Sequence, residues 1–376
     1  MALVKPDEAS FARIKVLGIG GGGGNVINTM IDNNQIKGVE FIAINTDTQA
    51  LLVNKAPTKI QIGENLTRGL GSGGDPEIGL KATEESAEKI KEYLLDTDMV
   101  FLAGGEGGGT FTGGAPVIAE IAKEAGALTI AVTTKPFAFE GARRMVIADE
   151  GIEKLKEKVD TLIVIPNQRI MEIVDKKVTL LEAFKIVDSV LSSGVQGISE
   201  IITVPGLINR DFADVKAIMK DAGSALLGIG TGVGENRAQI AAKTAISSPL
   251  LDISIEGAKG VLLNITGGPD LTMAEVDEAA RLITQAADAD ANIIFGAAIN
   301  ENMIDQVKIT VIATGFDEAK ARLAKMMPKP KFPQPEGIVS EPPEEKPPIE
   351  EKKEEEFPEE EFGDEFDIPA FLRQGK

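Results

Sequence analysis

The 376-residue sequence predicts an α/β fold: a Rossmann-like domain on a parallel sheet, a long central helix, a second smaller α/β domain and a disordered acidic tail. Two observations predict the folded part. Short apolar runs alternate with segments of helical periodicity, as in parallel strands joined by crossover helices. Glycine-rich stretches follow several of these runs, and open parallel sheets bind their ligands where the strands end. The tail is predicted because residues 341–367 are rich in proline and carry fourteen acidic and three basic residues, a net charge of −11.

The composition excludes several kinds of chemistry. The chain has no cysteine and no histidine, which removes disulfides, thiol or histidine nucleophiles and the usual zinc ligands. Any reaction must therefore use carboxylates, hydroxyls, amides, basic side chains and a bound cation. The formal net charge of −20 argues against non-specific nucleic-acid binding, which needs a basic surface. No stretch is long and apolar enough to span a bilayer, and residues 1–15 lack the apolar region of a signal peptide, so we expect a cytosolic protein.

The strongest functional signal is the stretch at residues 103–116, AGGEGGGTFTGGAP. It follows an apolar run at residues 98–102 that is typical of a buried strand, and it leads into helical apolar spacing at residues 117–122. A strand, a glycine-rich turn and a helix N-terminus form an anion site, because backbone N–H groups converge there and the helix dipole is positive. A tight strand-to-helix turn without a ligand would explain the same residues.

A second loop of this kind lies near the start of the chain. A predicted strand at residues 13–18 is followed by GGGGGN at residues 20–25 and by a helix at residues 26–31. The dinucleotide-binding pattern GxGxxG is satisfied by Gly18, Gly20 and Gly23.

The strand that follows supports a rival interpretation. It spans residues 39–44 and ends in Asn45, Thr46 and Asp47. A Rossmann enzyme has its ribose-binding acid near this strand end, and Asp47 could serve. A nicotinamide dehydrogenase is therefore an open alternative at this point.

Later segments continue the alternation of strand, loop and helix. A third glycine cluster at residues 69–76 precedes a helix predicted at residues 77–95. Further buried strands are predicted at residues 127–132 and 160–165. Glu140 and Arg144 lie four residues apart, on one face of the following helix, and such a pair is most often a surface salt bridge.

A long helix is predicted to begin at Thr179, where Glu182 completes a capping box. It is apolar along its length to about residue 201, so we expect it to be buried between two domains. The loop after it holds two carboxylates three residues apart, Asp211 and Asp214. The second domain is predicted as helices at 215–221, 236–247 and 273–287 and strands at 224–230, 259–266, 291–299 and 306–314.

Several motifs occur in the order typical of one protein family. The Walker pattern GxxxxGK[ST] is absent, which argues against an ordinary P-loop NTPase. The quoted motifs are GIGGGGGN from Gly18, NTD from Asn45, GGGTFTG from Gly107, PFAFEGARR from Pro136, NRDFADV from Asn209 and DIPAFLR from Asp367. Together they resemble the tubulin/FtsZ GTPase family, in particular its bacterial FtsZ branch. The resemblance covers the chain outside the acidic linker and makes the dehydrogenase a remote alternative.

The resemblance implies a GTPase that uses Mg²⁺ and polymerises head to tail into the ring of bacterial cell division. It implies phosphate binding by Gly21, Gly22, Gly23, Gly24, Asn25, Gly107, Gly108, Gly109 and Thr110. Glu140 and Arg144 would contact the ribose and phosphate region. Asn167 and Asp188 would read the guanine edge beside Phe184. The same nucleotide site would include Asn45, Asp47, Gly73, Gly113 and Thr134.

The resemblance also implies catalysis between subunits. The loop with Asn209, Asp211 and Asp214 would cap the γ-phosphate of the next protomer's GTP and orient a water, while magnesium offsets the added charge. From the residues alone, two acids that favour a helix dipole explain Asp211 and Asp214 equally well.

The domain limits expected from these features start with a flexible N-terminus at residues 1–10. The GTP-binding domain follows at 11–178, the central helix and catalytic loop at 179–214, the second α/β domain at 215–316, the acidic linker at 317–362 and a C-terminal peptide at 363–376. That peptide would bind membrane adaptors and other division proteins at mid-cell. The remaining partner would be the chain itself, with neither nucleic-acid binding nor direct membrane insertion.

Two residues depart from the family pattern. Phe111 stands where the family element has glycine, and Glu106 stands where an uncharged residue is usual. We expect Phe111 to have helical φ and its ring to point outward, toward the subunit junction. A carboxylate near phosphate is unfavourable unless it points away or meets the cation. The alternative function is therefore a polymerising nucleotide-binding scaffold that hydrolyses GTP weakly.

Overall fold

The computed structural model describes residues 12–33, 36, 38–173, 177–203, 211–248, 255–301 and 303–316. The expected N-terminal segment, the acidic linker, the C-terminal peptide and Asn209 lie outside these residues.

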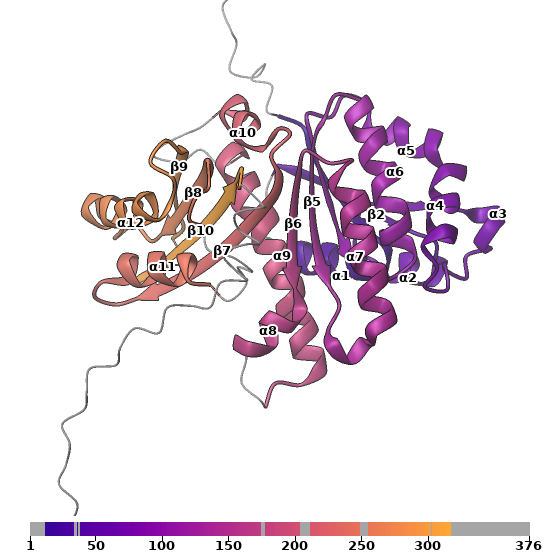
Figure 1. Ribbon diagram of the computed structural model, residues 1–376, viewed down its shortest axis with the longest axis horizontal. Coiled ribbons are helices and arrows are strands. Elements are labelled where there is room, and N and C mark those ends of the chain that lie inside the picture. Colours follow the sequence, from indigo (N-terminus) through magenta and orange to yellow (C-terminus); the bar gives the residue numbers. More distant parts are fainter. Residues whose placement is uncertain are drawn as a thin grey trace, which may run out of the picture. The chain divides into compact units, whose positions relative to one another are not determined.

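The first part of the chain alternates strands and helices, as expected (Figure 1). Its strands are β1 (Ile14–Ile19), β2 (Val39–Asn45), β3 (Thr58–Gln61), β4 (Met99–Gly105), β5 (Leu128–Lys135) and β6 (Thr161–Pro166). Its helices are α1 (Gly20–Asn33), α2 (Thr48–Val53), α3 (Glu64–Thr67), α4 (Pro76–Glu85), α5 (Ala87–Leu94), α6 (Thr110–Glu124), α7 (Ala142–Lys156) and α8 (Asn167–Ile173).

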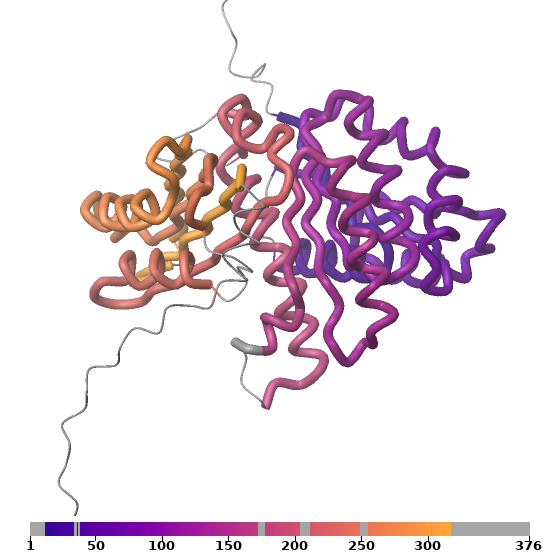
Figure 2. The backbone as a smooth tube through the Cα atoms, viewed as in Figure 1, coloured from indigo at the N-terminus to yellow at the C-terminus, as the bar shows by residue number. Residues whose placement is uncertain are grey.

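The long helix α9 (Leu180–Thr203) leads to the second part of the chain. That part comprises α10 (Phe212–Met219), β7 (Gly223–Val233), α11 (Arg237–Ile246), β8 (Gly260–Gly267), α12 (Met273–Ala286), β9 (Asn292–Ile299) and β10 (Gln306–Thr314). The backbone trace in Figure 2 follows α9 between the two parts. None of the described helices has the length and apolarity needed to cross a membrane.

The strands form one ten-stranded sheet in the order β3-β2-β1-β4-β5-β6-β7-β10-β8-β9. Neighbours from β3 to β7 are parallel, whereas β10 is antiparallel to both β7 and β8. Strand β7 joins the two parts: Gly223 pairs with Thr161 of β6, and Val233 at its other end pairs with Gln306 of β10. The α/β fold with a mostly parallel sheet is therefore confirmed, with an antiparallel β10 that the sequence did not predict.

Both faces of the first part of the sheet are covered by helices. Side chains alternate across the sheet, since successive residues of a strand point to opposite faces. On one face, Val16 and Phe101 pack with α1 and α9, while on the other Leu17 and Leu102 pack with α5, α6 and α7. Strands buried on both faces read as continuous apolar runs, which is why they were predictable.

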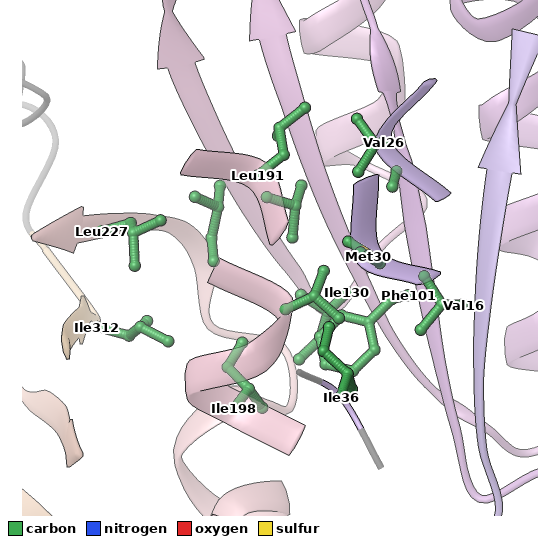
Figure 3. Close-up of a cluster of buried hydrophobic side chains, with 14 of the residues drawn as sticks. Val16, Val26, Met30, Ile36, Phe101, Ile130, Leu191, Ile198, Leu227 and Ile312 are labelled. Carbon is green, nitrogen blue, oxygen red and sulfur yellow. The ribbon is translucent and has the colours of Figure 1, made fainter. Parts of the chain in front are cut away.

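Helix α9 connects the cores of the two parts. Its residues Leu191 and Ile198 lie in one apolar cluster with Ile130 of β5 and with Leu227 and Ile312 of the second part (Figure 3). The opposite face of the second part's strands packs against α11 and α12. The predicted capping box at the start of α9 is confirmed. The Thr179 N–H donates to the Glu182 carboxylate at 2.8 Å, and the Glu182 N–H donates to the Thr179 hydroxyl at 3.3 Å.

Two local expectations were wrong. The glycine run at residues 20–25 is the first turns of α1 rather than a loop preceding a helix. The helix expected at residues 77–95 is divided at Ser86, whose φ of −107° and ψ of 11° are not helical. The Ser86 hydroxyl accepts the Gly63 N–H at 3.2 Å, a contact that favours the break.

Candidate functional site

The candidate site lies where β1, β2, β4, β5 and β6 end. Helix α1 begins directly after β1, and α6 begins a few residues after β4. Because β1 and β4 are paired and parallel, both helices begin at the same edge of the sheet. Each offers unpaired backbone N–H groups and the positive end of its dipole, and together they form a site for an anion with more than one charged group.

The glycine-rich start of α1, directly after β1, is built on backbone contacts. A Cβ atom at Gly18 would overlap the Gly23 carbonyl oxygen, and one at Gly23 would overlap the Ala103 carbonyl oxygen of β4. At Gly21 no atom would lie within 4 Å of an added Cβ. Gly18 and Gly23 therefore hold the helix against the sheet, while Gly21 faces open space suited to a ligand.

A cavity of about 150 Å³ adjoins the glycine-rich start of α1. It is lined in part by Gly20, Gly21, Gly24, Asn25, Asn45 and Asn54. The Asn54 amide donates to the Gly24 carbonyl at 2.9 Å, which ties α1 to the end of α2. Asn25 and Asn45, both expected in the nucleotide site, are thus brought together.

The loop between β4 and α6 depends on side chains as well. Gly107 has φ of +86°, which favours glycine, and its N–H donates to the Thr112 hydroxyl at 3.0 Å. An added Cβ at Gly107 would lie 2.7 Å from the Arg144 carbonyl oxygen, so α7 borders this loop closely. At Gly108 no atom lies within 4 Å of an added Cβ, and that face is open to a ligand.

Three buried hydroxyls meet at the N-terminus of α6. The Thr110 hydroxyl lies 2.8 Å from that of Thr46 and 3.1 Å from that of Ser72. Three hydroxyls carry three hydrogens, and these two bonds use two of them, so one remains to donate to a ligand oxygen. Thr46 and Ser72 were not among the expected site residues, because an isolated hydroxyl gives no signal in a sequence.

Glu140 and Arg144 form the expected ion pair, with 2.8 Å between Oε2 and Nη1. The Glu140 carboxylate also accepts the Phe137 N–H at 2.8 Å, and its side chain is only 13% exposed. The pair is therefore more than an exposed surface contact. It fixes the turn between β5 and α7 beside the Gly107 loop.

A third group of residues forms an aromatic and polar corner. Phe184 of α9 is 39% exposed and meets the edge of the buried Phe137 ring at 5.4 Å between centroids. Phe137 in turn stacks on Phe139 at 5.0 Å. Asp188 lies one turn after Phe184 on α9, and burial raises its pKa to about 7. Asn167 begins α8 and is buried, and its Oδ1 has no hydrogen-bond partner among the described residues.

Some expected site residues have a structural contact in the same place. Asp47 caps α2 by accepting the N–H groups of Gln49 at 2.8 Å and Ala50 at 3.2 Å. Gly113 lies in α6, where an added Cβ would overlap the Pro76 carbonyl oxygen of α4. Gly73 has φ of +63° and open space around it. Thr134 is buried, and its carbonyl accepts the Glu106 N–H at 2.9 Å.

Phe111 corrects one expectation. It lies in α6 without a positive φ, as expected, but its ring does not point outward. The side chain is 3% exposed and packs in the core with Leu102. An added Cβ at Gly104 would overlap the ring, so a glycine in β4 provides the space that the ring occupies.

Glu106 is buried and turned toward α7. Its side chain is 3% exposed, and Oε2 would lie 2.5 Å from a Cβ at Gly151 of that helix. Neither carboxyl oxygen has a hydrogen-bond partner in the described part of the chain. Burial raises the pKa of this carboxyl to about 8.

The two aspartates expected in catalysis lie elsewhere. Asp211 caps α10 by accepting the Asp214 N–H at 2.9 Å. Helix α10 ends at the opposite edge of the sheet, because the Met219 carbonyl accepts the hydroxyl of Thr161, the first residue of β6. Figure 1 shows α10, at whose start these acids lie, and α8, which Asn167 begins, at opposite ends of the sheet.

The described residues contain no group of three or more acidic side chains placed to hold a metal ion. The donors at the two helix N-termini suit phosphate oxygens instead. A magnesium ion bound with the nucleotide would therefore take its ligands chiefly from phosphate oxygens and water, as it usually does with phosphate substrates.

The fold and the site define an α/β protein with a candidate phosphate site between two helix N-termini at the carboxyl ends of a parallel sheet. Two family models match the chain. One is described as the GTPase domain of the Tubulin/FtsZ family and matches residues 13–175, and the other as the C-terminal domain of the FtsZ family and matches residues 223–317.

Solved structures agree with these matches. An empty FtsZ dimer from M. jannaschii is 47% identical, with a TM-score of 0.79 over 84% of this chain and 94% of its own. A variant FtsZ from the same organism is 50% identical, with a TM-score of 0.79 over 82% and 92%. A GTPγS-bound CetZ2 protofilament from Haloferax volcanii shares the fold at 19% identity, with a TM-score of 0.69 over 83% and 97%. The chain belongs to the tubulin/FtsZ GTPase family, which removes the dehydrogenase interpretation.

Proposed function

We propose that this protein binds and hydrolyses GTP and polymerises head to tail into filaments of a cell-division ring. The observation that carries the proposal is the meeting of α1, α6 and the Phe184–Asp188 corner at one edge of the sheet. The similarity to FtsZ from M. jannaschii does not point to a bacterial source, so the proposal does not include the bacterial setting.

The two glycine loops hold the phosphates in this proposal. Gly21 and Gly108 present open backbone to the ligand, and the hydroxyl chain at Thr110 donates its remaining hydrogen to a phosphate oxygen. Magnesium, when bound, neutralises charge on the β- and γ-phosphates. The Glu140–Arg144 pair lies beside the second loop and contacts the ribose and phosphate region.

Guanine is read by Asp188 and Asn167. An ionised carboxylate accepts two N–H groups, the pattern that guanine offers along one edge and adenine does not. The unpartnered Oδ1 of Asn167 accepts a further donor from the ligand. Phe184 supplies an exposed aromatic face for the base, since its ring is held in place by Phe137.

Hydrolysis takes place between subunits in this proposal. Asp211 and Asp214 begin the helix that ends at the edge opposite the glycine loops. A head-to-tail contact brings the two opposite edges of successive subunits together. The acids of one subunit then orient water at the GTP of the next.

The functional test combines GTP-dependent pelleting with phosphate release in the same tube. Pelleting and phosphate release are both expected with GTP and magnesium, and neither is expected with ATP. Pelleting without phosphate release would favour the polymerising scaffold instead. Phe111 no longer supports that scaffold, because its ring is buried in the core; Glu106 remains its only structural argument.

The C-terminal peptide at residues 363–376 is proposed to bind membrane adaptors at the division site. Its apolar residues Ile368, Phe371 and Leu372 follow an acidic linker, a pattern that suits a short helix in a partner's groove. Deleting residues 367–376 should leave GTP turnover and pelleting near normal and abolish recruitment to adaptor-bearing vesicles. Loss of pelleting in the deletion variant would instead make the peptide part of the polymerising fold.

The expected domain limits are proposed on the same grounds. Residues 11–178 would form the GTP-binding domain and residues 215–316 the domain that activates hydrolysis, with 179–214 joining them. Self-association is supported by the FtsZ dimer among the similar structures.

A further inference from the structure

Glu106 is a buried acid that the proposed mechanism does not use. It follows the last residue of β4 and directly precedes Gly107, where the second glycine loop begins. Its backbone is fixed, because its N–H donates to the Thr134 carbonyl at 2.9 Å. The side chain is 3% exposed, and neither carboxyl oxygen has a hydrogen-bond partner in the part of the chain that the structure describes. A buried carboxyl in this state strongly favours its neutral form.

The space around this carboxyl is closed by three elements. Oε2 lies against Gly151 of α7, at 2.5 Å from an added Cβ, and the methyl group of Thr112 in α6 closes the same place. The Thr112 hydroxyl also accepts the Gly107 N–H at 3.0 Å, so one residue touches both the carboxyl and the glycine loop. The carboxyl is thus packed behind the loop and cannot turn to solvent without moving α7.

The charged groups of the surrounding elements are engaged elsewhere or exposed. On β5, Lys135 pairs with Asp149 at 2.6 Å, and on α7, Arg144 pairs with Glu140 at 2.8 Å. The remaining charged residues of these faces are Arg143, Glu150, Glu153, Lys154 and Lys156 on α7, Glu77 on α4, and Glu120, Lys123 and Glu124 on α6. Among the described residues, no ion pair includes Glu106. Burial is the largest influence on this carboxyl and raises its pKa to about 8, while the adjacent Thr112 hydroxyl acts in the opposite direction.

We propose that Glu106 couples nucleotide binding to the uptake of one proton, so that the loop binds phosphates with this carboxyl neutral and loses affinity when it ionises. The inference rests on the proposed role of residues 107–110 as a phosphate site. An ionised Glu106 places a full negative charge one residue before that loop, inside a poorly screened interior. A neutral carboxyl adds no charge, and its proton comes from solvent and stays on a carboxyl oxygen.

The sign of the pH dependence follows from linkage. Bound phosphates disfavour the carboxylate, so they raise the pKa of Glu106 above its value of about 8 in the free protein. Nucleotide binding then takes up a proton above pH 8, and affinity falls as the pH rises. The Glu106 carboxyl also makes folding stability depend on pH. The native chain keeps a proton on it that the unfolded chain releases, so the free energy of unfolding declines between about pH 4.5 and pH 8.

The test is calorimetric titration with GDP, which is not hydrolysed, at pH 7 and pH 9 in two buffers of different ionisation enthalpy. Wild type, Glu106→Gln and the control Glu124→Gln are compared; Glu124 is an exposed acid at the end of α6. Guanine and the other titratable groups contribute equally in all three proteins. The ratio of the GDP affinities of wild type and Glu106→Gln at each pH therefore reports the effect of residue 106 alone. Wild type and Glu124→Gln should lose about tenfold more affinity than Glu106→Gln between these values, with up to one proton taken up.

Two outcomes would overturn the inference. Equal pH dependence of GDP affinity in wild type and Glu106→Gln would reject the role of Glu106 in proton uptake and leave the proposed function intact. Absence of GDP binding at every pH would reject the proposed function as well. Should Glu106→Gln fail to fold, carbon-13 labelling of the glutamate carboxyls decides in wild type. The Glu106 signal should titrate near pH 8 and move to higher pH with GDP; titration near pH 4.5 would contradict the proposal.

Discussion

The two glycine loops occupy equivalent places after paired strands, yet they are built differently. The segment where β1 runs into α1 depends on the absence of side chains, since Gly18 and Gly23 bring backbone against backbone. The segment at α6 contains Glu106 before the helix and Thr110, Phe111 and Thr112 in its first turn, and all four side chains are buried. The side chains of Phe111 and Glu106 are buried behind the candidate phosphate site, against Gly104 and Gly151 respectively. A candidate phosphate site thus accommodates large residues behind it where neighbouring glycines, here Gly104 and Gly151, make room for them.

The largest expected effect concerns Phe111. Phe111→Ala should destabilise the protein by about 3–5 kcal/mol, because the buried ring leaves a cavity. Gly104→Ala should also destabilise it, since the new methyl group overlaps the ring. In the double variant the methyl group enters the space that the ring vacates, so the double variant should be more stable than the sum of the two losses predicts. Urea unfolding measures all three; simple additivity would show that the ring and Gly104 are independent.

At the start of α1, the effect of a Gly→Ala substitution on stability should depend on the position of the glycine. Gly23→Ala should cost about 1–3 kcal/mol or more, because its Cβ overlaps the Ala103 carbonyl oxygen. Gly21→Ala is the matched control in the same helix: its Cβ meets nothing within 4 Å, and alanine favours a helix. Its stability should be unchanged or slightly higher. Equal losses at both positions in urea unfolding would contradict the division into packing and ligand-facing glycines.

The smallest expected effect is a pH dependence of GDP affinity that arises at Asp188, apart from both glycine-rich segments. Asp188 has a pKa of about 7 through burial, and guanine donors would lower it in the complex. GDP affinity should therefore fall about tenfold for each pH unit below 7, as the carboxyl takes up a proton. Asp188→Asn should weaken binding at neutral pH and flatten this acidic limb, while Glu106→Gln should leave it unchanged. An acidic limb that persists in Asp188→Asn belongs to another group.

Much of the fold was predictable because its signals are local. The strands buried on both faces are continuous apolar runs, and Thr179 with Glu182 marks the start of α9. The helical start at Gly20 was missed because glycine disfavours helices, and tertiary contacts override that preference here. The direction of the Phe111 ring depends on Gly104, which is close in space rather than in the helical pattern. Asp188, Asn167 and Thr110 lie in three different helices, α9, α8 and α6, so only the family resemblance placed them in one candidate site.

We propose above all that the glycine-rich segments of one subunit and Asp214 of the next form one active site. Asp214→Ala should bind GTP and form lasting filaments, with turnover reduced by about 10²–10⁴-fold. Gly21→Asp should fold, since space is open there, but its charge should repel the phosphates. The deciding measurement is phosphate release from an equal mixture of these two variants. Turnover well above that of either variant alone is predicted, because intact halves meet at mixed junctions; a mixture as inactive as its components, although both enter the same filaments, would contradict the claim.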